Sequence, residues 1–485
     1  MNVHPLQLAI VIIYLGGMLL IGFLVNKYKI RTSSDYMVAG RSMGLLFIAA
    51  SLSANNVGGG STTGLAAKAF DGWGMSAAWY VLAASIAMIP MAYFAPKIRK
   101  TLAVTIPEVL YRRFGAPSAL ITAVLNIASL FCLTSSQILA SASVISSLTG
   151  LSVNISLFLA GGVIIFYTTM GGLMADTISD LIQYFIIFIG LAITTPFVIE
   201  GVGGWHAITS KIPPVDLDIN KIGVLMILSL IFNYFCTFLS GPEMVSRFEA
   251  ADSEKTARRA ALLSGLMMAA IAFFPTLIGL AALSANPGLD GGAGTTALTW
   301  ATANYAPKFV GGLVSAAIIA ATISSADSNL LAASTMFVKD IYERHINPSI
   351  ADHKLIFITR ACNVVICLGS IFIGTLGVSL ITMNLFAFAL RSAGPFAAYA
   401  LGLACPGATR YTGIVSIIVG SISAVIWQLA GEPFGLLPIV FGCVCGTLAF
   451  LLTWWIEKRM GHGPAPTAYL TPEQERALEE SHGKL

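Results

Sequence analysis

One stretch decides the fold of this chain: Ser53-Ala54-Asn55-Asn56-Val57-Gly58-Gly59-Gly60-Ser61-Thr62-Thr63-Gly64. It lies inside an apolar segment that is long enough to cross a membrane. Three adjacent glycines beside two asparagines and three hydroxyl residues favour an interrupted helix, although close helix packing through small residues is the alternative. An interruption at this depth would free carbonyls for a cation and N–H groups for a polar solute.

The composition places most of the chain in lipid. Of 485 residues, 56% are hydrophobic and only 10% are charged, which is too little charge to coat a soluble protein of this size. The net charge is only +4 and the basic residues do not form one run, so we expect no nucleic-acid partner. The lipid bilayer is therefore the first partner that the sequence predicts.

Apolar segments near the spanning length recur along the whole chain. They predict an all-α integral membrane protein with about thirteen transmembrane helices. The predicted spans are 6–26, 43–69, 73–96, 117–149, 153–172, 175–199, 221–242, 257–283, 309–338, 355–378, 380–404, 411–430 and 434–457.

Lys and Arg are distributed unevenly between the two sides of these helices. If the N-terminus lies outside, the outer side keeps only Lys211, Lys221 and Lys308, with Lys68 at a helix end. This bias follows the positive-inside rule. We therefore expect a multi-pass protein of the cell membrane with its N-terminus outside. Residues 1–459 would form the transmembrane domain, and residues 460–485 a short cytoplasmic tail.

The ninth predicted span carries a polar face. Ala321, Ser324, Ser325 and Ser328 are spaced i, i+3, i+4 and i+7, so they share one side of the helix. Oxygen ligands of this kind suit a hard, weakly held ion. By spacing alone, hydroxyls that bond back to their own i−4 carbonyls are the more common arrangement, and both explanations stay open.

Four ionisable residues fall at membrane depth: Asp176, Asp180, Asp327 and Arg391. Burying such groups is costly, so each is a functional candidate by default. Asp176 has a second explanation, as a solvated charge at the cytoplasmic edge. Arg391 has two explanations of similar weight, a clamp for a carboxylate on the solute or a structural partner of a buried aspartate.

Several motifs, taken in order and at their spacing, resemble the sodium:solute symporters, the group that contains sodium–glucose, proline, sialic-acid and choline transporters. The resemblance covers nearly the whole chain. It is carried by Leu52–Phe70, by Gly171-Gly172 with Ser179–Gln183, by Gly241–Phe248 leading into Ala257–Ala260, and by Ser324-Ser325 running to Lys339–Tyr342.

The resemblance implies a LeuT-type core of two inverted five-helix repeats, at about 43–199 and 221–404. The extra helices would be 6–26, 411–430 and 434–457. It also implies a secondary active transporter, not an enzyme, that couples inward sodium movement to solute uptake by alternating access. A monomer would be sufficient for transport. The six histidines all fall in tails or loops, which also argues against an enzyme.

The resemblance also implies where sodium binds. The main site maps to the carbonyls of Ala54, Val57 and Ala321 and to the hydroxyls of Ser324 and Ser325. A second sodium site, present in some members, maps to Asp180, Asp327 and Ser328, with Ser325 shared between the two sites. Asp327 replaces a serine that such members often have, which leaves the stoichiometry open.

The solute is expected near the midplane, beside the broken span. Because Arg391 disfavours a cation and no aromatic cage is evident, we expect a small anionic or zwitterionic organic molecule. The candidate contacts are Asn55, Asn56, Ser61, Thr62, Gln137, Asn233, Tyr234 and Arg391.

Overall fold

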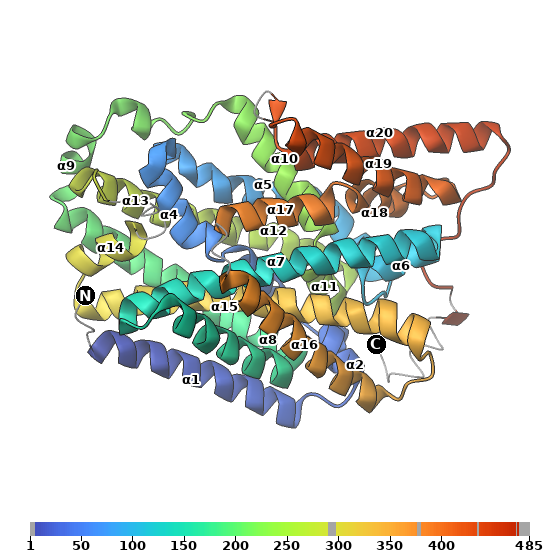
Figure 1. Ribbon diagram of the computed structural model, residues 1–485, viewed down its shortest axis with the longest axis horizontal. Coiled ribbons are helices and arrows are strands. Elements are labelled where there is room, and N and C mark those ends of the chain that lie inside the picture. The colour runs from blue at the N-terminus through green and yellow to red at the C-terminus, as the bar shows by residue number, and fades with distance from the viewer. Residues whose placement is uncertain (1–4, 290–296, 376–379, 434–435, 472, 475–485) are drawn as a thin grey trace.

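The computed structural model describes residues 5–289, 297–375, 380–433, 436–471 and 473–474, and within them the chain is helical with no strand. Figure 1 shows most of the long helices running along the longest axis of the molecule, as expected for a bundle that crosses a membrane. One parallel bridge between Met43 and Ala251 links two loops. The predicted all-α membrane fold is confirmed.

The helices have the following bounds. They are α1 Pro5–Tyr28, α2 Ser33–Val38, η1 Ala39–Arg41, α3 Leu45–Asn56, η2 Gly60–Gly64, α4 Leu65–Lys68, η3 Ala69–Trp73, η4 Gly74–Ala78, α5 Trp79–Lys100, α6 Ile106–Phe114, α7 Ala116–Thr149, α8 Val153–Gly201, α9 Gly204–Lys211, η5 Pro214–Leu217, α10 Val224–Ser240, α11 Pro242–Ala250, α12 Glu254–Ile271, α13 Phe273–Ala285, α14 Ala297–Tyr305, α15 Lys308–Met336, η7 Phe337–Ile346, α16 Asp352–Thr375, α17 Leu380–Ser392, α18 Pro395–Ala404, α19 Arg410–Leu429 and α20 Pro438–Arg459.

In the described part of the chain, ten helices are long and apolar enough to cross a membrane, or eleven if the bent pair α10–α11 is one span. The count of thirteen and the two repeats stay predictions. The kink at Gly172 explains part of the difference, because it divides the 49 residues of α8 between two predicted spans. A side chain at Gly172 would be strained, since φ is +54° and its Cβ would lie 2.6 Å from the Tyr36 carbonyl oxygen.

Helix α15 lies at the centre of the bundle, against α7, α8 and α1 (Figure 1). Its sequence is rich in Ala, Gly and Ser, and these small side chains let neighbouring helix backbones approach closely. Every residue from Val314 to Met336 is buried. The serine face predicted for this helix is therefore held inside the protein, away from lipid.

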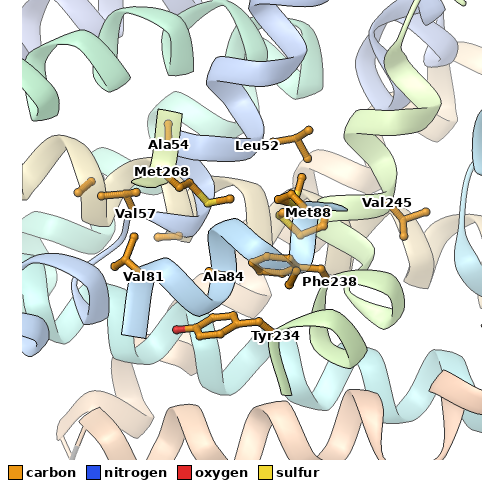
Figure 2. Packing of buried hydrophobic residues seen from close by; sticks show 14 of the residues in the cluster. Leu52, Ala54, Val57, Val81, Ala84, Met88, Tyr234, Phe238, Val245 and Met268 are labelled. Carbon is orange, nitrogen blue, oxygen red and sulfur yellow. The ribbon is translucent and has the colours of Figure 1, made fainter. Parts of the chain in front are cut away.

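Two interrupted helices pack around the same apolar cluster. The first is α3 with its continuation from Gly60, and the second is α10–α11, which bends by 60° at Gly241. Figure 2 shows α10 placing Tyr234 and Phe238 beside α5 and the end of α3. The cluster includes Leu52, Ala54, Val57, Val81, Ala84, Met88, Val245 and Met268.

The segment after α20 is not simply a solvated tail. The Ala465 N–H donates to the Ala408 carbonyl at 2.8 Å, and Arg113 donates to the carbonyls of Ala465 at 3.0 Å and Pro466 at 2.7 Å. Ala465 and Ala468 are buried. The predicted tail therefore begins as a segment packed against the bundle, while residues 472 and 475–485 lie outside the described residues.

Candidate ion and solute site

The predicted break in the second span is confirmed. Helix α3 ends at Asn56, and helical geometry resumes at Gly60 in a π-helical turn. Within the described residues around this break, neither the Ala54 nor the Val57 carbonyl oxygen accepts a backbone hydrogen bond. Both residues are fully buried. Buried carbonyls without partners are costly, and a cation is one group that would satisfy them.

Helix α15 meets the break through Ser325. Its Oγ donates to the Asn55 carbonyl oxygen at 2.7 Å and also to its own i−4 carbonyl, Ala321, at 3.1 Å. A Cβ added to Gly58 would lie 2.6 Å from this Oγ, so only glycine permits such a close approach. The structure therefore places Ser325 beside the break, where it makes the i−4 bond that the sequence left as one alternative; its role as an ion ligand stays a prediction.

Ser324 points to a second group of buried polar residues. Its Oγ donates to Asp180 Oδ1 at 2.5 Å, and Ser51 donates to the other oxygen of the same carboxylate. Ser328 Oγ lies 3.2 Å from Asp176 Oδ2. Asp327 faces Asp176, and its buried Oδ2 has no hydrogen-bond partner. These contacts join the residues predicted for the second sodium site to Asp176.

A buried arginine that the sequence analysis missed lies at the centre of this group. All three nitrogens of the Arg247 guanidinium donate hydrogen bonds: Nε to Ser51 Oγ at 3.0 Å, Nη1 to the Glu243 carbonyl at 2.7 Å, and Nη2 to Asp176. Nη2 also lies 3.5 Å from Asp180. Asp176 is therefore a buried, paired carboxylate, and its interpretation as a solvated charge at the membrane edge is wrong.

Next to the break lies a cavity of about 550 Å³. Its lining is rich in amide and hydroxyl groups, and it includes most of the predicted solute contacts. They are Asn55, Asn56, Ser61, Gln137, Tyr234 and Arg391. Among these, Gln137 accepts a bond from the Gly59 N–H at 3.1 Å, and the buried Asn55 Nδ2 has no partner.

Two predicted contacts lie elsewhere. Asn233 lines an adjoining cavity of about 1130 Å³ that also reaches Lys68 and Trp73. Thr62 lines neither cavity, because its hydroxyl is turned to the Gly58 carbonyl at 3.0 Å. A threonine in a helix commonly bonds to its own i−4 carbonyl, and this local bond turns the Thr62 hydroxyl away from the cavity.

Aromatic rings cover one side of the cavity, where the sequence showed no evident aromatic cage. Tyr80 and Tyr234 meet edge to face with their ring centroids 5.5 Å apart, and Phe238 lies 5.4 Å from Tyr234. Phe388 completes this wall from α17. The sequence did not reveal the wall because its four rings come from three helices.

Arg391 is paired with a glutamate. Its Nη1 donates to Glu243 Oε1 at 2.6 Å, and both side chains line the cavity. Glu243 stands in the first turn of α11, directly after the bend at Gly241, with Pro242 at the start of the helix. The Gly-Pro pair was a local signal for this bend, because proline cannot continue the preceding helix and is favoured at the first helical position.

Comparison with known proteins gives a consistent result. The sequence pattern of the sodium:solute symporter family matches residues 36–420 of this chain. The high-affinity proline transporter PutP of Bacillus subtilis is 27% identical, and the match covers 92% of this chain and 97% of that protein. The sodium/glucose cotransporter of Vibrio parahaemolyticus is 27% identical, with 84% and 82% covered.

Solved structures agree on the architecture. A Na⁺-coupled sialic acid symporter in a substrate-bound outward-open state matches with a TM-score of 0.81 at 21% identity, covering 96% of this chain and 99% of that one. Mhp1, a nucleobase–cation symporter in a closed conformation, matches with a TM-score of 0.60 at 15% identity, covering 87% and 95%. At these identities the likeness concerns the fold, and it confirms the LeuT-type architecture.

Proposed function

The chain belongs to the sodium:solute symporter family, and on that premise we propose that its sodium ion binds where the broken helix α3 meets α15. The protein is a multi-pass membrane transporter, not an enzyme, and it couples sodium movement to the uptake of a small solute by alternating access. What we propose beyond this is the placing of the ions, the class of solute and the orientation.

The main sodium site consists of the carbonyls of Ala54, Val57 and Ala321 and the hydroxyls of Ser324 and Ser325. The observation that carries this proposal is the contact between Ser325 and the break, at 2.7 Å from the Asn55 carbonyl oxygen, beside two carbonyls left unpaired by unwinding. Neutral oxygen ligands suit sodium because they replace its hydration shell without holding it too tightly.

A second sodium ion binds near Asp180, Ser325, Asp327 and Ser328. The carboxylate of Asp180 is buried and shares Arg247 with Asp176, and Asp327 lies beside Asp176, so three buried aspartates lie close to one another with two of them paired to a single guanidinium. Buried charge of this sign is expensive unless a cation balances it. A sodium ion beside Asp180 would supply that balance and would bring α8 and α15 together.

The solute occupies the cavity beside the break and is an anionic or zwitterionic organic molecule. Arg391 disfavours a cation in this place, and the amide groups of Asn55, Asn56 and Gln137 offer neutral hydrogen bonds. The relatives named above carry proline, glucose and sialic acid, so they include a zwitterion, a neutral sugar and an acid.

The N-terminus lies outside, and the C-terminus lies in the cytoplasm. With this orientation the larger cavity, which reaches Lys68 and Trp73, opens towards the outer side. On the opposite side Arg41 donates to the Leu102 carbonyl at 2.6 Å and Arg99 to the Ala251 carbonyl at 2.6 Å, and Arg41 and Leu102 line a further cavity there. One chain contains the whole site, so a monomer is sufficient for transport.

Coupling follows from where sodium binds. An ion held by both α3 and α15 favours the conformation in which these helices are in contact, and the solute then binds to a cavity that is already formed. The two inverted repeats, about 43–199 and 221–404, would move against each other during closure. The membrane potential adds about 2.3 kcal/mol per charge for each 100 mV.

The test is removal of single hydroxyls. We expect Ser324→Ala or Ser325→Ala to abolish sodium-stimulated uptake in proteoliposomes while the protein still folds. Ser315→Ala is the matched control, because this buried serine of the same helix bonds only to its own i−4 carbonyl, Gly311, at 2.9 Å. Unchanged sodium dependence in either of the first two variants would refute the site.

A further inference from the structure

Glu243 and Arg391 form an ion pair whose hydrogen bonding is incomplete. They are joined by one bond, from Nη1 to Oε1 at 2.6 Å, and their side chains are only 5% and 3% exposed. Glu243 Oε2 and Arg391 Nε are both buried without a hydrogen-bond partner. One charged acceptor and one charged donor are thus left over in residues that line the same cavity.

Leaving such atoms unpartnered costs free energy, because each has lost its water without gaining a bond. A ligand that carries both a carboxylate and an N–H ammonium would satisfy both atoms at once. Its carboxylate accepts from the guanidinium, and its ammonium donates to the free glutamate oxygen. Charge-assisted hydrogen bonds of this kind are about twice as strong as neutral ones.

We propose that Glu243 and Arg391 together select a zwitterion with a free ammonium and a carboxylate a few bonds apart, the arrangement of an amino acid. This inference rests on the proposed role of the cavity as the solute site, and it narrows that proposal from "anionic or zwitterionic" to one class. It also assigns Glu243 a role in solute specificity.

The other classes of solute leave a charge uncompensated. A simple anion that pairs with Arg391 places its own charge beside Glu243, and a simple cation that pairs with Glu243 faces Arg391. Like charges at close range in a dry site are strongly unfavourable. A neutral sugar meets neither requirement. Only a molecule with both charges gives each unpartnered atom a charged partner and also leaves the net charge of the cavity unchanged.

The rest of the cavity suits the uncharged part of such a molecule. Tyr80 and Tyr234 offer ring surfaces, and Phe388 stacks near Arg391, whose Cζ lies 5.0 Å from the ring centroid. The ring over the guanidinium restricts its orientation. The free Nδ2 of Asn55 is a further donor for the carboxylate.

The first experiment uses the unaltered full chain in detergent. Its thermal stability is measured with each amino acid in sodium and in potassium, and then with the N-acetyl and the amide derivatives of the amino acid that stabilises best. Ligand binding to the folded state raises the apparent stability by mass action. We expect both derivatives to bind about ten- to a hundredfold more weakly, because each loses one charge-assisted bond.

An N-acetyl derivative or an amide that binds as tightly as its parent amino acid overturns the inference. So does a panel in which no amino acid stabilises the protein, whatever else binds. These failures are distinct from failure of the sodium site. If an amino acid stabilises equally in sodium and potassium, selection of zwitterions stands and the sodium assignment falls. If only a sugar or a simple acid stabilises the protein, and does so in sodium alone, the sodium assignment stands and the selection of zwitterions falls.

The second experiment changes the glutamate. We expect Glu243→Gln to weaken amino-acid binding by about ten- to a hundredfold while binding of the N-acetyl derivative is kept or improved, which reverses the preference. Glu249→Gln is the matched control, since Glu249 is a buried glutamate of the same short helix that does not line this cavity. An unchanged preference in Glu243→Gln overturns the inference, and if this variant does not fold, the first experiment decides.

Discussion

The two buried arginines near the break, Arg247 and Arg391, are in very different surroundings. Arg247 is fully enclosed, and each of its three nitrogens donates a hydrogen bond. Arg391 is bonded to one carboxylate, keeps an unpartnered Nε, and lines a cavity. A saturated arginine holds helices in place, whereas an unsaturated arginine at a cavity is available to a ligand.

A single short helix supplies a partner to both arginines. Glu243 at the start of α11 pairs with Arg391, and Arg247, one turn later, donates to the Glu243 carbonyl at 2.7 Å. The solute cavity and the aspartate group are therefore joined by one rigid turn of helix. A movement of Glu243 towards a solute would displace Arg247 relative to Asp176 and Asp180, which is a physical route for coupling between solute and ion.

The largest expected effect is on stability, at the enclosed arginine. Arg247→Gln leaves Asp176 and Asp180 without their cation, and breaking a buried pair in this way costs about 3–5 kcal/mol. Thermal unfolding of the purified variant, at one fixed scan rate, should show a clear loss of stability. Arg391→Gln is the comparison, and its loss should be smaller because Arg391 is bonded to one carboxylate, whereas each of the three nitrogens of Arg247 donates a hydrogen bond. The opposite order would contradict the distinction between the two arginines.

The next effect is on sodium dependence. Asp180→Asn removes the carboxylate that receives Ser51 and Ser324 and lies beside Arg247. If a second sodium ion binds there, the Hill coefficient for sodium-driven uptake should be above one in the unaltered protein and should fall to about one in Asp180→Asn. Solute affinity at saturating sodium should change little, because Asp180 does not line the cavity. An unaltered coefficient would remove the second site.

Features with a local cause could be predicted from the sequence. The break after Asn56 follows from three consecutive glycines, and the serine face of α15 follows from helical spacing. The bend at Gly241 also has a local cause, the Gly-Pro pair, but this pair stands at the end of an apolar segment that was predicted as one unbroken span. The positions of both breaks in the helices therefore depend on local sequence, and the second bend could have been predicted in the same way as the first.

Pairings between distant residues could not be predicted. Arg247 and Asp176 are 71 positions apart, Arg391 and Glu243 are 148 apart, and Ser324 and Asp180 are 144 apart. Which carboxylate faces which arginine depends on the packing of whole helices, and a single sequence does not contain that information. The sequence could identify Arg391 as costly to bury, but it could not distinguish a solute clamp from a structural pair.

The smallest expected effect concerns Asp176, which holds Arg247 away from Asp180. The Arg247 Nη2 bonds directly to Asp176, whereas it lies 3.5 Å from Asp180. In Asp176→Asn the nearest charged partner of the guanidinium becomes Asp180, so the arginine competes with sodium for that carboxylate. We expect the sodium concentration for half-maximal uptake to rise several-fold, which corresponds to a loss on the order of 1 kcal/mol in sodium binding.

Asp176→Glu keeps the charge, so its half-maximal sodium concentration should stay close to that of the unaltered protein. If Asp176→Asn leaves the half-maximal concentration unchanged or lowers it, Arg247 is not a competitor at Asp180, and the aspartate group is then structural in the same sense as Arg247 itself.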